Sequence, residues 1–403
     1  MKSRPNGKNT RMLKSFRRQD NGKDTKNTKI LKIFSRKSDC IFMAAGIVLA
    51  LTGVGLRQTA KGSTAFADWY VQWVYPVLTG TIGRVSSLFP FSLMEFGGYA
   101  LVILFVFFTI RHWKEPMWMF SRTVWLAGMM LFLFSTACGI NYYHQPFSSY
   151  LNWEMRDSSA VELWELCRDL TDRLNQSVQE VEEMEAQEKM ENWEDVWDAK
   201  RYAEESIEAM KNLGMQYPQL SGYYPRPKPL AVSWFLSVTQ LAGVYCPYTI
   251  EANYNADMTP YNIPHTVCHE LSHLKGFMRE DEANFIGYLA CVESSSEVFR
   301  YSGYMLGWIH ATNALYSVSA FELPDGTKTT GREAYIGFME EVAERAREDM
   351  NRNNLFWDQY EGKVAEAANQ MNDTYLKINS QEDGVKSYGR VVDLMLAYYR
   401  EKN

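Results

Sequence analysis

Two histidines and a glutamate in the second half of the chain have the residue types and the spacing of a metal site. They lie in the segment His269-Glu270-Leu271-Ser272-His273, which has the pattern HExxH. Residues four apart lie on one face of a helix, so both imidazoles can bind one metal ion. Glu270 follows the first histidine directly and can take a proton from a metal-activated water. Zinc suits imidazole and carboxylate ligands, so the segment predicts hydrolytic chemistry with Zn2+ as the cofactor.

A third ligand is expected a few residues downstream. Gly276 stands where the first helix can end in a left-handed residue, so a second helix can begin near Met278 and run back past the first. Glu280 and Glu282 are both candidates. They point about 200° apart on an ideal helix, so only one of them can reach the metal, and the spacing leaves both open.

The run Glu280-Asp281-Glu282-Ala283-Asn284 resembles the ExxA(D/N) segment of gluzincin-type zinc peptidases. The resemblance implies that Glu280 is the third ligand, with Glu282 as the alternative, and that Asn284 steadies a ligand histidine. The metzincin pattern fits less well, because Arg279 stands where its last ligand would be. Residues 40–400 also resemble a bacterial membrane-protein family known only as a domain of unknown function. That resemblance supports the architecture and implies no substrate.

Two residues near the C-terminus could complete a catalytic site. Hydrolysis of an amide needs a donor for the oxyanion that forms when water attacks. Tyr388 and Arg390 are the candidates, and the alternative is that both cap a helix or lie in the core.

The other histidines and the cysteines are expected to play structural parts. We expect His265 to support the site or lie at the surface, His310 to lie in the core, and His144 to lie at a membrane interface. Cysteines beyond the apolar runs could form two disulfides, but we expect them to be free and buried. They are Cys167, Cys246, Cys268 and Cys291.

The segments around the motif predict a mainly helical domain with a small sheet. Two runs rich in β-branched and aromatic residues, Leu230–Val238 and Gly243–Asn255, predict strands just before the HExxH helix. Apolar residues at helical spacing predict the helices. These cover Ser158–Ser177, Val196–Leu213, Asp281–Ala311, Arg332–Arg352, Phe356–Asn372 and Gly384–Arg400, with an acidic stretch at Glu180–Glu194.

Three apolar runs precede this domain. Cys40–Leu56, Phe91–Ile110 and Val124–Ile140 carry one charge between them, Glu95. A helix needs roughly 17–25 apolar residues to cross a membrane, so all three are predicted to span it. The predicted domains are a basic disordered leader (1–39), a three-helix membrane anchor (40–140) and an extracytoplasmic α+β domain (141–403), which the resemblance makes zincin-like.

Charge gives the predicted orientation of these segments. Residues 1–39 hold thirteen Lys/Arg against three Asp, whereas residues 141–403 have a net charge of −19. Arg111, Lys114 and Arg122 make the loop between the second and third runs basic. The positive-inside rule places the leader and this loop in the cytoplasm and everything after about residue 141 outside. The outer loop 57–90 carries Trp69, Tyr70, Trp73 and Tyr75, as in a helix lying at lipid headgroups.

Composition excludes some classes of protein. Hydrophobic residues make up 46% of the 403-residue chain and charged residues 22%, so it is not a disordered tail. The predicted function is a multi-pass cell-membrane zinc metallopeptidase that acts on a peptide or protein. The alternative is a non-catalytic zinc-binding sensor or assembly protein of the cell envelope. A transporter using Glu95 is disfavoured, and the expected partners are the lipid bilayer and a polypeptide, with no nucleic acid.

Overall fold

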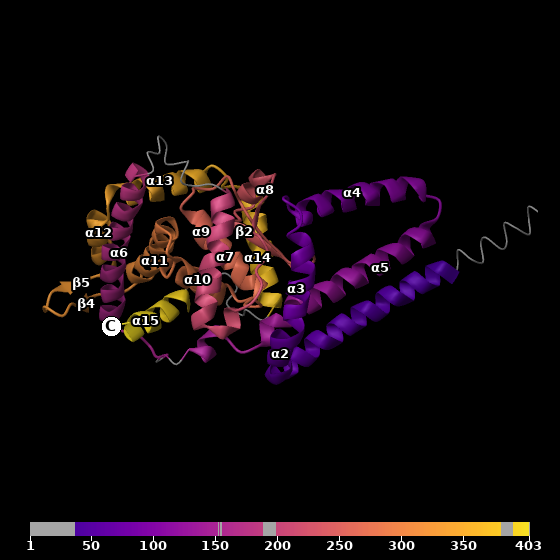
Figure 1. Ribbon diagram of the computed structural model, residues 1–403, viewed down its shortest axis with the longest axis horizontal. Coiled ribbons are helices and arrows are strands. Elements are labelled where there is room, and N and C mark those ends of the chain that lie inside the picture. The colour runs from indigo at the N-terminus through magenta and orange to yellow at the C-terminus, as the bar shows by residue number, and fades with distance from the viewer. Residues whose placement is uncertain (1–36, 152, 154, 188–198, 380–389, 403) are drawn as a thin grey trace, which may run out of the picture. The chain divides into compact units, whose positions relative to one another are not determined.

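The computed structural model describes residues 37–151, 153, 155–187, 199–379 and 390–402 (Figure 1). Three helices are long and apolar enough to cross a membrane: Lys37–Gly62, Leu93–Arg111 and Pro116–Tyr143. They contain the first and third predicted runs and all of the second run, Phe91–Ile110, except its first two residues. The predicted fold class, mainly α with three membrane-length helices followed by small sheets, is therefore confirmed. Most of the predicted leader, residues 1–36, lies outside the described residues.

The chain divides into two compact units, residues 1–55 with 101–132 and residues 56–100 with 133–403. Within the first unit, glycines let the helices come close. A Cβ atom on Gly128 would lie 2.0 Å from the carbonyl oxygen of Gly46. Arg122, one of the basic residues used to orient the chain, pairs with the buried carboxylate of Asp39. The predicted domain boundaries at residues 39 and 140 stay predictions.

The second unit is built mainly from helices. Trp308 is its largest fully buried side chain, and its Nε1 donates to Thr171 Oγ1 at 2.9 Å. This bond joins α11 to α6, and α9, α10 and α11 pack against one another. The helices and helical turns are α2 (Thr64–Trp69), η1 (Tyr70–Val74), α3 (Tyr75–Ser86), α4 (Leu93–Arg111), α5 (Pro116–Phe134), η2 (Ser135–Gly139), η3 (Asn141–Tyr143), η4 (Phe147–Tyr150), α6 (Ala160–Gln187), α7 (Ala199–Gln216), η6 (Pro218–Leu220), α8 (Ser233–Val238), α9 (Asn262–Leu274), α10 (Glu280–Val292), α11 (Glu297–Tyr316), α12 (Gly331–Glu341), α13 (Glu344–Asp358), α14 (Lys363–Ile378) and α15 (Arg390–Lys402).

A three-stranded sheet precedes α9 in the chain, and α8 lies between its first and second strands. Its order is β1 (Lys228–Pro229), β3 (Glu251–Tyr254) and β2 (Gly243–Cys246). β2 runs antiparallel to β3, with Val244 opposite Asn253, and β1 is parallel to β3. β2 is therefore an edge strand of this sheet. A separate hairpin pairs β4 (Phe321–Glu322) with β5 (Lys328–Thr329).

The strand predictions were partly wrong. Leu230–Val238 forms no strand, because Ser233–Val238 is the helix α8. Gly243–Asn255 is two strands rather than one, because a turn at residues 247–250 reverses the chain. Ile250 adopts a φ of 51° in this turn, a conformation that β-branched residues rarely take, so the residue types did not predict the reversal.

Three predicted helices are each broken in two. Asp281–Ala311 divides into α10 and α11, and Arg332–Arg352 divides into α12 and α13. Phe356–Asn372 is divided between the end of α13 and α14. The segment after the first membrane-length helix is helical as predicted, but its aromatic residues do not share one surface. Trp69 and Trp73 are exposed, whereas Tyr70 and Tyr75 are buried.

Candidate functional site

Two helices joined by a tight turn hold the candidate site. His269 and His273 lie one turn apart on α9, which ends at Leu274. Gly276 follows with a φ of 101°, the left-handed conformation that the sequence predicts for it and that glycine adopts without strain. The chain then reverses, and α10 begins at Glu280. The turn therefore returns Glu280 to the face of α9 that carries the histidines.

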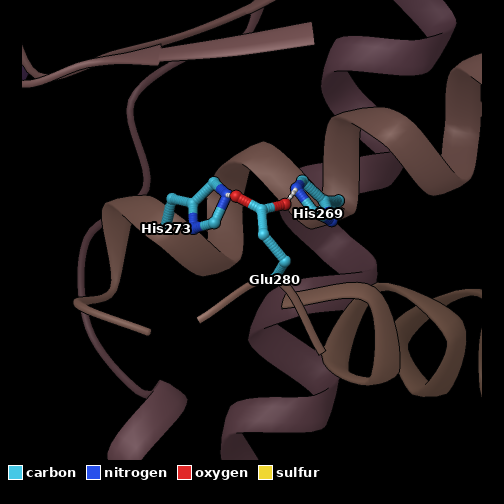
Figure 2. A group of neighbouring side chains, drawn as sticks. All are labelled: His269, His273 and Glu280. Atoms are coloured by element: carbon cyan, nitrogen blue, oxygen red, sulfur yellow. Dashed lines mark ion pairs between the residues drawn. The ribbon is translucent and has the colours of Figure 1, made fainter. Parts of the chain in front are cut away.

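The three side chains converge on one point (Figure 2). Glu280 Oε2 lies 3.4 Å from His269 Nε2, and Glu280 Oε1 lies 3.7 Å from His273 Nε2. One nitrogen from each histidine and one oxygen from Glu280 all lie within 4.8 Å of one another. The three side chains are only 10–17% exposed.

Hydrogen bonds fix which nitrogen of each ring faces Glu280. His269 Nδ1 lies 2.9 Å from Asn284 Oδ1, and His273 Nδ1 lies 2.8 Å from the carbonyl oxygen of Phe277. Both partners are acceptors, so each Nδ1–H donates and each neutral ring keeps the lone pair on Nε2. Two imidazole lone pairs therefore point toward the carboxylate of Glu280.

The close crossing of α9 and α10 depends on a glycine. A Cβ atom on Gly287 would lie 3.2 Å from the carbonyl oxygen of His265 and 3.2 Å from the amide nitrogen of His269. His265 Nε2 donates to the backbone carbonyl of Asn284 at 3.1 Å, so His265 joins the two helices. This contact fits the supporting role that we expected for His265.

Glu270 points into the same cavity as the histidines. Its Oε2 atom is buried and has no hydrogen-bond partner among the described residues. Gly243 makes room for this carboxylate, because a Cβ atom at position 243 would lie 2.5 Å from Glu270 Oε1. Burial raises the pKa of Glu270 to about 8.

Burial also shifts the pKa values of the two histidines. Burial, together with the neighbouring charge of His269, lowers the pKa of His273 to about 4. For His269 burial acts in the same direction, but the hydrogen bond and charge of Glu280 outweigh it, and the net pKa is raised. Neutral imidazole is the form that binds a metal, and a bound cation would lower the pKa of each of these groups.

The site opens into a cavity of about 840 Å³. The edge strand β2 forms one side of the cavity, and Tyr245 of β2 has its ring 6.5 Å from that of His273. Three residues at the end of the helix Pro116–Tyr143 also line it, together with side chains from α14. These residues are Phe134, Cys138, Tyr142, Asn369, Asn372 and Tyr375.

Several candidate residues lie elsewhere. Glu282 Oε1 accepts from the Phe147 amide at 3.0 Å and from Arg279 at 3.0 Å, so its carboxylate faces away from the histidines. Arg390 lies beside Asp281 at 3.3 Å and is not among the described residues that line the cavity. Tyr388 lies outside the described residues.

The remaining expectations concern His144 and the cysteines. His144 is buried and donates through Nε2 to the carbonyl oxygen of Gly276 at 3.0 Å, so it supports the turn between α9 and α10. The four cysteines of the predicted external domain are free and buried, as we expected. They are Cys167, Cys246, Cys268 and Cys291.

The sequence did not predict the contacts that surround the site. Gly243 and Tyr245 were predicted only as strand residues, and the residues of α14 that line the cavity were not singled out. Gly243 lies 27 positions before Glu270 in the chain, and no local pattern pairs the two. A glycine within a strand, which often marks a close approach, was the one available indication.

Comparison with known protein families identifies the family of the chain. A family model described as "Protein of unknown function (DUF3810)" matches residues 70–396, which is most of the chain, so the protein belongs to that family. No curated protein and no solved structure matches the chain.

Proposed function

We propose that the protein is a membrane-anchored, zinc-dependent peptidase that hydrolyses peptide bonds outside the cytoplasm. One observation carries the proposal: Glu280 lies between the Nε2 atoms of His269 and His273, with Glu270 beside them in the same cavity. Two imidazoles and a carboxylate are a ligand set of known catalytic zinc sites. The HExxH spacing and the resemblance of residues 280–284 to gluzincin peptidases agree with this reading.

The residues fit a zinc ion by their chemistry. Both Nε2 lone pairs face the carboxylate, and hydrogen bonds to Asn284 and Phe277 hold the rings in that orientation. Such partners commonly orient metal-binding histidines. Zinc, when bound, supplies a Lewis acid that polarises the scissile carbonyl and makes a water nucleophile available at neutral pH.

Glu270 is the proposed general base. Its free Oε2 atom accepts a proton from the attacking water, and the carboxyl group then returns this proton to the amine that leaves when the C–N bond breaks. A pKa of about 8 would keep much of Glu270 protonated near neutral pH without a cation. A cation held by the neighbouring ligands lowers that pKa and favours the carboxylate that acts as the base.

The substrate is proposed to bind along β2. The strand lies at the edge of its sheet, and its residues line the cavity that holds the histidines. An extended peptide can add to such an edge through main-chain hydrogen bonds. Gly243 and Tyr245 lie at this edge, so the peptide would pass directly over Glu270 and His273.

The cellular setting is part of the proposal. Three membrane-length helices and the bias of Lys and Arg toward the leader and the 111–122 loop favour a multi-pass cell-membrane protein. The N-terminus would be cytoplasmic and the domain after residue 141 extracytoplasmic. The lipid bilayer and a polypeptide are then the partners.

One observation favours the alternative, a non-catalytic zinc-binding sensor or assembly protein. Arg390, one of the two predicted oxyanion donors, lies beside Asp281. The presence of Glu270 favours the peptidase, because zinc binding alone does not require a base beside the ligands.

Substitution of Glu270 distinguishes the two functions. The full-length protein in detergent should retain zinc after Glu270→Gln, because the amide keeps the shape of the side chain against Gly243. Hydrolysis of unstructured fluorogenic peptides should fall by about 10²–10⁴-fold, the usual value of a general base. Glu322→Gln on the exposed strand β4 is the control and should keep full activity. Full hydrolysis by Glu270→Gln would exclude the mechanism, and no zinc-dependent hydrolysis by the wild type would favour the sensor.

A further inference from the structure

The end of a membrane-length helix forms part of the candidate site. Pro116–Tyr143 has 28 residues. At 1.5 Å per residue it is about 42 Å long, whereas the hydrocarbon core of a bilayer is about 30 Å thick. The helix is therefore about 12 Å longer than the hydrocarbon core, and its last two turns contribute Cys138 and Tyr142 to the cavity that holds the histidines. The end of this membrane-length helix thus forms part of the cavity wall.

The edge strand is attached to the same helix end. Tyr245 of β2 donates from its hydroxyl to the carbonyl oxygen of Ala137 at 3.1 Å, and the same hydroxyl lies 2.9 Å from Tyr75 Oη. In the same cavity, Cys138 Sγ lies 3.8 Å from Met278 Sδ, in the turn that leads to α10. The proposed peptide-binding edge therefore lies against the last turns of the membrane helix.

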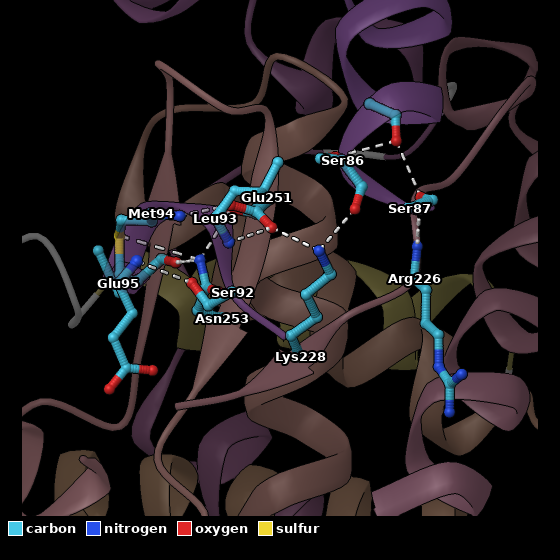
Figure 3. A network of polar contacts seen from close by, with 12 residues as sticks. Ser86, Ser87, Ser92, Leu93, Met94, Glu95, Arg226, Lys228, Glu251 and Asn253 are labelled. Atoms are coloured by element: carbon cyan, nitrogen blue, oxygen red, sulfur yellow. Dashed lines mark hydrogen bonds and ion pairs between the residues drawn. The ribbon is translucent and has the colours of Figure 1, made fainter. Parts of the chain in front are cut away.

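A second membrane-length helix is attached to the same sheet (Figure 3). The carboxylate of Glu251 on β3 accepts from the amides of Leu93 and Met94 at 3.0 and 2.8 Å, which caps the start of α4. Lys228 of β1 donates to Glu251 at 2.6 Å and to the carbonyl oxygen of Ser86 at 2.7 Å. Lys228 and Glu251 are fully buried, so this connection is shielded from water.

The first turn of α4 also holds α8 in place. Glu95 accepts from the amides of Ala231 and Val232 at 2.8 and 2.9 Å, just before α8 begins. α8 then exposes Trp234 and Phe235, which are 57% and 60% accessible. Exposed aromatic side chains on a helix held beside the start of a membrane-length helix suit the headgroup region of a bilayer.

We propose that the substrate is a membrane-anchored polypeptide, cut within a few residues of its own membrane segment. This inference rests on the proposed function. The attachments of the sheet to the ends of two membrane helices keep the cleft at the bilayer surface. An extended segment next to the membrane helix of another protein already lies at the height of the cleft. A soluble protein would have to unfold a loop to reach the cleft. Anchoring in the same bilayer also raises the local concentration of the substrate.

The test uses full-length protein in phosphatidylcholine vesicles supplied with zinc. Each of three probes carries the same unstructured reporter of randomised sequence. In the first probe a five-residue Gly/Ser spacer joins the reporter to a Leu/Ala transmembrane helix. In the second the spacer has forty residues, with a root-mean-square length of roughly 35 Å. The third probe has no helix. Fluorescence gives the rates, mass spectrometry locates the cleaved bonds, and Glu270→Gln supplies the background.

The first probe should be cut at least ten times faster than the third, with the second between them. Equal rates for all three probes, or faster cutting of the third, would overturn this inference and leave the proposed peptidase intact. If no probe is cut faster by the wild type than by Glu270→Gln, the proposed function fails and the inference fails with it.

Discussion

At the scale of single residues, the site depends on which atoms are left free. Nδ1 of both histidines is engaged by acceptors, so only Nε2 can face Glu280. Oε2 of Glu270 has no partner among the described residues, although it is buried. A buried acceptor without a partner normally costs about 1–3 kcal/mol, and such costs are tolerated where chemistry requires them.

Gly243 gives a test of how closely Glu270 must be positioned. In Gly243→Ala the new methyl carbon would lie 2.5 Å from Glu270 Oε1 and 2.8 Å from its Cγ, so the carboxylate must move. We expect peptide hydrolysis to fall by at least tenfold while zinc is retained. Overpacking of this kind costs about 1–3 kcal/mol of stability.

The control for this substitution is Gly337→Ala on α12, where a Cβ atom would meet nothing within 4 Å. Zinc content, thermal unfolding and hydrolysis of the two variants should be measured together. Wild-type activity in Gly243→Ala would show that the position of Glu270 does not limit the reaction.

Local patterns predicted part of the site. Four-residue spacing placed His269 and His273 on one face, and Gly276 ended their helix as predicted. The gluzincin resemblance selected Glu280 over Glu282 and paired Asn284 with a histidine, and the structure brings these side chains together. Local patterns could not predict contacts between segments that are distant in the chain, such as that of Gly243 with Glu270.

At the scale of elements, the sequence predicted the long helices better than the short ones. Apolar spacing over many residues identifies α6 and α7 without knowledge of their neighbours. The segment that forms α8 has β-prone residues, but Glu95 binds the two amides before it, and Glu95 lies 136 residues away from Ala231. Tertiary contacts of this kind override intrinsic strand preference.

Glu251 tests the connection between the sheet and α4. Glu251→Gln removes the charge that pairs with Lys228 and weakens the cap on the amides of Leu93 and Met94. Breaking a buried ion pair on one side costs about 3–5 kcal/mol, so the midpoint of thermal unfolding in detergent should fall clearly. Glu322→Gln on an exposed strand should leave it unchanged. An unchanged midpoint for Glu251→Gln would mean that the connection contributes little to stability.

At the scale of the whole molecule, the distribution of charge determines the proposed orientation. The leader carries an excess of ten positive charges, and the segment after residue 141 has a net charge of −19. Cytoplasmic loops are those enriched in Lys and Arg. The carboxylate of Asp39 offsets the positive charge of Arg122 in the 111–122 loop, but the charges of Arg111 and Lys114 remain in this loop.

Reporter fusions test this orientation. A reporter after residue 403 should be active outside the cytoplasm, and one in the 111–122 loop should be active inside it. The reason is that the three membrane-length helices place these two points on opposite sides. A cytoplasmic signal from residue 403 would invert the proposed topology and place the candidate site in the cytoplasm.

The zinc content of the purified full-length protein tests the central claim most directly. After dialysis against trace zinc, the wild type should hold one zinc per chain and His273→Ala should hold none. Glu280→Ala should bind zinc at least 10–100-fold more weakly, the range seen when even supporting residues of a metal site are lost. Glu282→Gln should keep its zinc, because Glu282 bonds to Phe147 and Arg279 instead. A wild type without zinc, or loss of zinc from Glu282→Gln alone, would contradict the account.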